Sequence, residues 1–303
     1  MSTKKRYIIG SNALGGFPEL EIDYDRFDKL KKARDVLRHA LAIEEKYELI
    51  ITNYLDLEKE ATNFAITGLV RKHTGTPNFS EIKNAITVRI LNLLTAARLY
   101  VDSLTNHILS CISNTCIKST DIRQLFVDEF ESNFNYCFME ALRNYAQHCA
   151  TPVHQICKQY KIQNDGENAK EFAVDFYAKK STLSLDNSFK RETLKKMPTR
   201  VNLREAARSY VESLSRIQQK TRELICESVN FSRETFEDAR NQYIEFSNDM
   251  PRNLYAFELE NMIAIRKVLI DLEWDDIRLA LLERNPELEK LTKMHITSKP
   301  SID

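Results

Sequence analysis

The sequence predicts a mainly α-helical protein, a helical bundle of long helices with one small β-hairpin. Its 303 residues include only six glycines and seven prolines, so few positions interrupt a helix. Neither residue type occurs between Pro18 and Gly68. In that stretch the apolar residues recur at the three- and four-residue spacing of an amphipathic helix.

The first long helix is expected in the N-terminal quarter of the chain. Asp23 or Asp25 provides its N-cap, since an aspartate side chain accepts hydrogen bonds from the first free amides of a helix. The helical spacing then continues, and the helix either runs on or breaks once around residues 52–53. Gly68 marks its expected end, because glycine weakens a helix.

Two further helices are expected before the middle of the chain. After a loop at residues 74–77, Ser80 caps a helix whose apolar face extends to Ile108. The third helix begins near residues 119–121 and carries a row of phenylalanines. It ends before Pro152, because proline disfavours the helical conformation in the residue that precedes it.

The pattern then changes to alternation. Apolar and polar residues alternate at 156–162 and again at 172–176, with turn-forming residues at 164–168 between them. This is typical of a β-hairpin. A long polar helix is expected from about 200 to 247, and more helix through Leu288 after an interruption. The interruption consists of Asn248, Pro251 and Asn253.

The composition is that of an ordinary globular protein. Hydrophobic residues make up 43% of the chain and charged residues 29%, and 44 basic residues balance 44 acidic ones. A formal net charge of zero provides no overall field that would draw the protein to nucleic acid or to a membrane. Any site for a polyanion must therefore be local.

Neither a targeting signal nor a membrane span is recognised in the sequence. The basic residues 1–6 are followed by too few apolar residues for a signal peptide. No apolar run approaches the ~18 residues of a transmembrane helix. The six cysteines include no C-x-x-C pair and are interpreted as reduced thiols. We expect a cytoplasmic protein with no membrane partner.

The most informative stretch runs from Arg143 to His148 and reads Arg-Asn-Tyr-Ala-Gln-His, shortly before Pro152. Arginine is a planar, permanently charged donor that matches phosphate oxygens, and histidine exchanges a proton near neutral pH. His148 falls in the last expected turn of its helix, where free carbonyls favour a protonated imidazole. The pair predicts cleavage of a phosphodiester with no metal ion and no cofactor.

The same spacing occurs once more, at Arg34 and His39. Residues five apart on a straight helix point about 140° away from each other, at 3.6 residues per turn. The helical pattern continues for more than twenty residues after His39, so this pair is expected to stay splayed and to have no function. At His148 the helix ends, which leaves the backbone room to depart from ideal geometry.

The segment from Phe138 to His148, and Asn144 directly after Arg143 in particular, resembles the signature of HEPN domains. These all-helical domains carry an R-x4-6-H motif with a small polar residue after the arginine. The resemblance covers the helix with the motif closely and residues 80–160 as a helical pair. Some family toxins are neutralised through a tyrosine two positions after the histidine, but Ala150 stands there in this chain, so that control is not expected.

The resemblance implies a metal-independent endoribonuclease, plausible in a defence or toxin–antitoxin system. Arg143 and His148 would be the catalytic pair, and Asn144 would orient them. Two subunits commonly form one composite site in this family, so a homodimer is expected, together with an RNA substrate and in some systems a regulatory protein partner. Three parts of the chain follow: residues 1–160 as a HEPN-like bundle with the motif, residues 161–198 as β-hairpin and linker, and residues 199–303 as a long C-terminal helical region.

Other polar residues near the motif have alternative interpretations. His154 is either a second proton-transfer group or an ordinary loop histidine. Glu140 lies one helical turn before Arg143, where it either orients the arginine for catalysis or simply neutralises it. In the second case His148 does no more than close the helix.

A basic series in the expected helix after residue 200 is a second, weaker candidate. Residues 190–222 contain ten Lys or Arg and three acidic residues. Arg200, Arg204 and Arg208 repeat every four residues, with Arg216 further along, and form a stripe suited to an RNA backbone. The alternatives are a solvated face or a seam for an acidic partner.

A non-catalytic helical adaptor that binds RNA or a protein is the alternative function. Trp274 and the acidic segment at residues 271–276 would suit such a partner. The sequence contains no P-loop, no G-x-S-x-G, no H-E-x-x-H and no dinucleotide fingerprint. Those enzyme classes are therefore not favoured.

Overall fold

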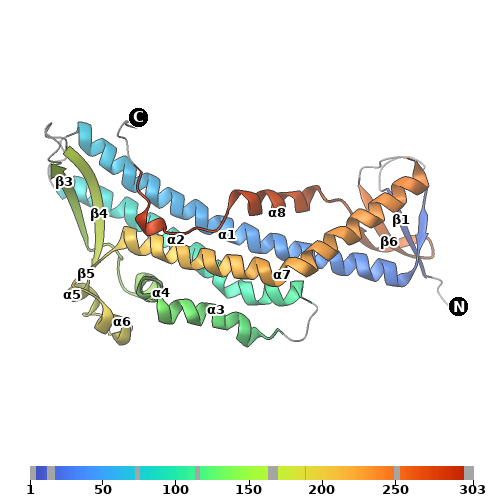
Figure 1. The fold of residues 1–303 in the computed structure, drawn as a ribbon, viewed down its shortest axis with the longest axis horizontal. Coiled ribbons are helices and arrows are strands. Elements are labelled where there is room, and N and C mark those ends of the chain that lie inside the picture. Colours follow the sequence, from blue (N-terminus) through green and yellow to red (C-terminus); the bar gives the residue numbers. More distant parts are fainter. Residues whose placement is uncertain are drawn as a thin grey trace. The chain divides into compact units, whose positions relative to one another are not determined.

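The computed structural model describes residues 5–11, 18–71, 76–112, 117–162, 170–187, 189–248 and 253–296. The protein is mainly α-helical, as the sequence predicts (Figure 1). Three helices dominate: α1 (Tyr24–Val70), α2 (Thr76–Cys111) and α7 (Leu203–Ser247), with 47, 36 and 45 residues. Their buried positions recur every three or four residues, as at Phe27, Leu30, Ala33 and Leu37 of α1.

The chain forms two compact units, and each unit takes segments from distant parts of the sequence. One consists of residues 1–45, 103–119 and 220–286, and the other of residues 46–102, 120–219 and 287–303. Helices α1, α2 and α7 each contribute residues to both units. This differs from the three consecutive parts expected from the sequence. The HEPN-like segment lies in the second unit.

Helix α1 begins and ends as expected. The side chain of Asp23 accepts a hydrogen bond from the amide of Arg26 at 2.7 Å, so Asp23 is its N-cap. The helix continues without a break past residues 52–53 to Val70. The start expected for α2 at Ser80 is wrong, because α2 begins at Thr76. Proline is tolerated in a first helical turn, so Pro77 lies inside α2 and does not precede it.

The single helix expected between residue 119 and Pro152 is two helices, α3 (Ser119–Ser132) and α4 (Phe134–His148). Asn133 separates them and caps α4: its side-chain oxygen accepts hydrogen bonds from the amides of Asn135 and Tyr136. Its amide nitrogen donates to Ser209 and Ser213 of α7, at 3.0 and 2.9 Å. These contacts fix the start of α4, and with it the segment that resembles HEPN domains.

The predicted β-hairpin is confirmed. Strands β3 (Gln155–Ile162) and β4 (Lys170–Lys179) pair antiparallel, with Ile156 opposite Phe176. A third strand, β5 (Arg200–Asn202), pairs with β4 and leads directly into α7. Between β4 and β5 lie the short helices α5 (Lys180–Leu183) and α6 (Arg191–Lys196). The turn expected at residues 164–168 lies outside the described residues.

The other unit contains a four-stranded antiparallel sheet that the sequence analysis missed. Its strand order is β2 (Leu20–Ile22), β1 (Lys5–Ser11), β6 (Leu254–Glu260), β7 (Ile263–Leu269). The continuous helix expected through Leu288 is therefore wrong for residues 254–269. Helix α8 (Glu273–Arg284) and a turn of 3-10 helix, η1 (Leu291–Lys293), follow the sheet. No helix in the described part of the chain is long and apolar enough to cross a membrane.

Residues 287–294 run beside α7 and are held by side chains of that helix. The hydroxyl of Ser215 accepts from the amide of Leu288 at 2.8 Å, and Glu212 accepts from the amide of Leu291. Arg208 donates to the carbonyl of Met294 at 2.7 Å. Side chains at three positions of α7, each about one helical turn apart, thus bind backbone groups of this C-terminal segment. In a sheet or a helix, such groups would bind other backbone groups.

Candidate functional site

Helix α4 positions the Arg143–His148 segment at the surface of its unit. One face of α4 is fixed in the core by Phe138 and Leu142, both fully buried. Arg143 is half-buried, whereas Asn144 and His148 are exposed. His148 is the last residue of α4, as expected, and the helix closes with hydrogen bonds from the amides of residues 149 and 150 to the Tyr145 carbonyl.

The guanidinium of Arg143 makes one contact of note, to the neighbouring residue. Its Nη2 donates to the side-chain oxygen of Asn144 at 2.6 Å. Its Nε is buried and has no hydrogen-bond partner among the described residues. No carboxylate of those residues pairs with Arg143, so this cation keeps its capacity to bind an anion.

Glu140 is oriented by a residue that the sequence analysis did not identify. Its Oε1 accepts a 2.5 Å hydrogen bond from the hydroxyl of Tyr210, a fully buried residue of α7. In the described structure Glu140 therefore neither neutralises Arg143 nor orients it through an ion pair. No local pattern in the sequence indicates this role of Tyr210, because Tyr210 lies 70 residues after Glu140.

The structure does not bring Arg143 and His148 together within one chain. Both residues lie on regular helix, since α4 extends through His148 itself. Residues five apart on such a helix project about 140° apart. The expected departure from helical geometry at His148 is absent, and it begins one residue later, at Cys149 (φ −128°, ψ −66°).

His154 is a half-buried residue whose ring is tied to β4. Its Nδ1 accepts a hydrogen bond from the amide of Lys179 at 2.9 Å, and its Nε2 is buried without a partner in the described residues. Burial lowers the pKa of His154, and the positive charge of Lys83 acts in the same direction. With one ring nitrogen buried and the other engaged by the Lys179 amide, this histidine is not placed to exchange a proton with a ligand in this conformation.

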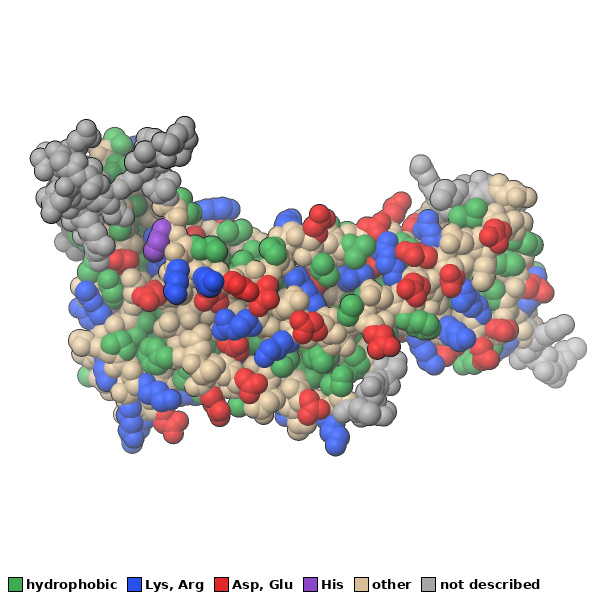
Figure 2. Space-filling view, in the orientation of Figure 1, with side chains coloured by type: hydrophobic (Ala, Val, Ile, Leu, Met, Phe, Trp, Pro, Cys, Tyr) green, Lys and Arg blue, Asp and Glu red, His purple; other side chains and the backbone are tan. Residues whose placement is uncertain are grey.

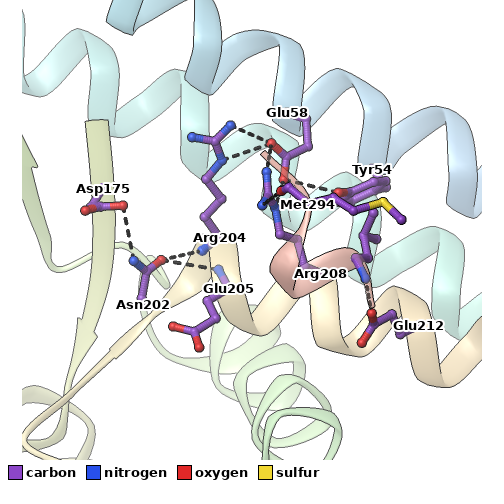
Figure 3. A network of polar contacts seen from close by, with 10 residues as sticks. Tyr54, Glu58, Asp175, Asn202, Arg204, Glu205, Arg208, Glu212 and Met294 are labelled. Atoms are coloured by element: carbon purple, nitrogen blue, oxygen red, sulfur yellow. Dashed lines mark hydrogen bonds and ion pairs between the residues drawn. The ribbon is translucent and has the colours of Figure 1, made fainter. Parts of the chain in front are cut away.

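The basic series of α7 points inward and forms a seam with acidic groups. Figure 3 shows the guanidinium groups of Arg204 and Arg208 directed at the carboxylate of Glu58 on α1. The nitrogen–oxygen distances are 2.6–3.0 Å, and the Glu58 side chain is only 9% exposed. Tyr54 donates to the same carboxylate at 3.2 Å. Arg204 and Arg208 are thus committed internally and do not form an open track for RNA.

Two other members of the basic series are also engaged. Arg216 binds the carboxylate of Glu129 on α3 through two nitrogens, at 2.8 and 2.6 Å. Arg200 lies over the ring of Tyr177, 4.1 Å from its centroid. On the face drawn in Figure 2, basic and acidic side chains are interspersed among the described residues. Three arginines of the series, Arg204, Arg208 and Arg216, thus pair with glutamates of their own unit.

The second Arg–His spacing and the acidic C-terminal segment are engaged in their own unit. Arg34 pairs with Asp35 at 3.1 Å, and His39 contacts His107, with 2.9 Å between the two Nδ1 atoms. In the acidic segment, the completely buried Asp275 accepts from two arginines. The ion pairs of this segment join Arg240 to Asp271, Arg233 to Asp275 and Asp276, and Arg278 to Asp275.

The described residues contain no cluster of three or more His, Cys, Asp or Glu side chains arranged to hold a metal ion. The cysteines at 111, 137, 149, 157 and 226 are not in disulfides, and Cys116 lies outside the described residues. Comparison of the chain with protein-family models, with curated proteins and with solved structures finds no match. The site is therefore interpreted from its own geometry and from the resemblance of its sequence.

Proposed function

We propose that this protein is a metal-independent endoribonuclease of the HEPN type that acts in the cytoplasm, with Arg143 and His148 as its catalytic pair. One observation carries the proposal: Arg143 is half-buried and has no carboxylate partner in the described structure. By contrast, Arg204 and Arg208 share the carboxylate of Glu58, and Arg216 pairs with Glu129. A cation that is partly desolvated and unneutralised binds a phosphate more strongly than one that is already paired.

The proposed reaction is a transesterification. The RNA 2′-hydroxyl attacks the adjacent phosphorus, and the bond from phosphorus to the 5′-oxygen of the next nucleotide breaks. His148 transfers a proton, and Arg143 stabilises the charge that develops on the non-bridging oxygens. Asn144 holds the guanidinium in place through its 2.6 Å contact. The products are a 2′,3′-cyclic phosphate and a 5′-hydroxyl.

A second copy of the chain would complete this site. In-line cleavage benefits from a base and an acid on opposite sides of phosphorus. One chain supplies one exposed histidine on α4, directed away from Arg143 by the helical geometry. If α4 lies near a two-fold axis, His148 of the second copy can approach Arg143, and two histidines then serve one scissile phosphate.

We therefore expect a homodimer in which the two α4 helices face one cleft. Sedimentation equilibrium measures the mass, and a paramagnetic label at Ala150→Cys, in a variant whose six native cysteines are replaced by alanine, measures the distance between the two α4 ends. If the two labels lie within about one to two helix diameters of each other, the result agrees with the composite site. An active species with the mass of a monomer, or a dimer with the labels far apart, contradicts it.

The proposed activity is tested by incubating the purified protein with mixed RNAs in EDTA. Wild-type protein is expected to produce fragments with cyclic phosphate and 5′-hydroxyl ends, and His148→Ala is expected to produce none above background. His295→Ala is the matched control, since His295 is another exposed histidine of the same unit. Intact RNA with wild-type protein, or equal cleavage by His148→Ala, contradicts the proposal. Binding of RNA without cleavage would point to the adaptor function instead.

The biological setting is carried by the resemblance alone. A defence or toxin–antitoxin role predicts that expression of the wild-type chain slows growth of a host cell and that His148→Ala does not. A regulatory protein partner would appear as a factor that relieves this effect. Both expectations depend on the proposed ribonuclease activity, so neither holds if the protein does not cleave RNA.

A further inference from the structure

Glu140 and Arg143 are positioned to neutralise each other. They are three residues apart on α4, so their side chains are neighbours on one face of the helix. Opposite charges at this spacing pair by default, because the attraction needs no change in the backbone. Such a pair would occupy the arginine that the proposed reaction requires. The structure shows a different arrangement, and Tyr210 accounts for it.

Tyr210 is held rigidly beneath α4. Its side chain is completely buried, and its ring packs against Tyr136 with 5.2 Å between centroids. A buried tyrosine hydroxyl requires a hydrogen-bond partner, and in the described structure this hydroxyl donates to Glu140 Oε1 at 2.5 Å. Burial, reinforced by the charge of Glu140, raises the pKa of Tyr210 well above its ordinary value. The hydroxyl therefore remains a donor throughout the physiological pH range.

Arg143 lies within electrostatic reach of this pair. The charge of Arg143 opposes the rise in the pKa of Tyr210, although burial and Glu140 dominate. Yet the guanidinium donates to Asn144 and not to Glu140. The carboxylate of Glu140 is thus bound to the neutral phenol and not to the stronger, charged donor one helical turn away.

We infer that Tyr210 is a positioning residue for the Arg143 site: its hydroxyl holds Glu140 away from Arg143, so that the guanidinium stays available to a phosphodiester anion. This inference rests on the proposed function for the identity of the anion. The hydroxyl acts through Glu140 and does not touch the substrate. Its removal frees the carboxylate to rotate toward its neighbour on α4, and the ion pair that forms must break before a phosphate binds.

The kinetic test compares Tyr210→Phe, Glu140→Gln and the double variant. Tyr210→Phe is expected to lower kcat/KM for RNA cleavage about five- to tenfold, the range expected when a partly buried ion pair competes with the substrate. Glu140→Gln alone should cleave like wild type, because a glutamine still accepts from Tyr210 and carries no charge. The double variant should recover the activity that Tyr210→Phe loses.

The kcat/KM of the double variant distinguishes a positioning role of Tyr210 from a role in core packing. A role for Tyr210 in core packing alone predicts that the double variant is as slow as Tyr210→Phe, and that result overturns the inference. Wild-type activity in Tyr210→Phe also overturns it. Tyr136→Phe is the matched control: it removes a hydroxyl from the adjacent buried ring, which makes no hydrogen bond to Glu140 in the described structure, and should leave kcat/KM unchanged.

A second readout does not depend on RNA cleavage. The Nε–Hε resonance of Arg143, followed by NMR in the absence of RNA, reports whether the guanidinium is paired. It should shift in Tyr210→Phe and return to the wild-type position in the double variant. If wild type fails to cleave RNA but the resonance behaves in this way, the proposed function is wrong and the positioning by Tyr210 stands. An unchanged resonance in Tyr210→Phe overturns the positioning.

Discussion

Replacement of Glu58 by alanine is expected to lower the free energy of unfolding by about 3–5 kcal/mol, the cost of leaving a buried charge without its partner. Glu58 is the common acceptor of Arg204 and Arg208 (Figure 3), and the Arg208 side chain is itself only 11% exposed. Without the carboxylate, the guanidinium of Arg208 keeps its hydrogen bond to the Met294 carbonyl but has lost the negative charge that it binds. Urea denaturation of the full chain, followed by circular dichroism, measures the change.

Glu60→Ala is the matched control for this substitution. Glu60 lies two residues along the same helix and faces Arg89 at 3.6 Å, with a side chain that is 22% exposed. Exposed or loosely formed pairs contribute little, so the expected change is within about 1 kcal/mol. Equal losses in the two variants would mean that the seam between α7 and Glu58 adds no specific stability.

The ion pairs of Glu58 with Arg204 and Arg208 also make the free energy of unfolding depend on pH. Burial acts to raise the pKa of Glu58, but the hydrogen bonds from Arg208 and Arg204 outweigh burial and lower it below the ordinary value. The folded state therefore binds this proton less readily than the unfolded chain. The contribution of the pair is present above the unfolded pKa of about 4.3 and is lost as the pH falls through the lower, folded pKa. Glu58→Gln should remove this acid-dependent part of the unfolding free energy.

Arg143→Ala is expected to lower kcat/KM for RNA cleavage by about two orders of magnitude or more, the scale of a group that acts directly on the transition state. Arg143→Lys keeps the charge but loses the planar fork of donors, so its activity should fall between wild type and Arg143→Ala. Arg123→Ala, at an exposed arginine of α3, controls for the loss of positive charge. Equal kcat/KM in Arg143→Ala and wild type would remove Arg143 from the reaction.

Periodicity and caps made much of the helical fold predictable. The start of α1 at Asp23 and its course through residues 52–53 follow from aspartate capping and an unbroken apolar spacing. The break at Asn133 did not follow, because phenylalanines at four-residue spacing continue across it. A cap residue in the middle of an apolar pattern becomes visible only when its partners, Ser209 and Ser213, are known.

The β6–β7 hairpin was missed for a reason of local chemistry. Its two central turn residues, Asn261 and Met262, both have positive φ angles, of 50° and 66°. A tight turn of this kind usually places glycine or a short polar residue there, and methionine gives no such signal. The strand before it, Leu254–Glu260, alternates only in part. Because the sequence shows no turn signal here, helix was expected. The segment is instead a hairpin, stabilised by pairing of its two strands.

The candidate site was predictable in its positions but not in its contacts. The spacing of Arg143 and His148 and the end of α4 at His148 follow from the sequence. The basic stripe was misjudged because its acidic partner, Glu58, lies about 150 residues away and no local count of charge includes it. Tyr210 was overlooked for the same reason. Long-range pairing decides which arginines are neutralised, and that pairing is a property of the tertiary structure.

The pairing of β1 with β6 determines when the chain can fold during synthesis. Lys5 and Glu258 form an ion pair across a sequence separation of 253 residues, and β1 meets β6 along its whole length. A nascent chain holds β1 without that neighbour until residue 260 has left the ribosome. Contacts this distant in sequence form slowly, and an unpaired strand edge invites pairing with other chains. Strand β2 can cover one edge of β1 early, but most of the chain is synthesised before β6 covers the other edge.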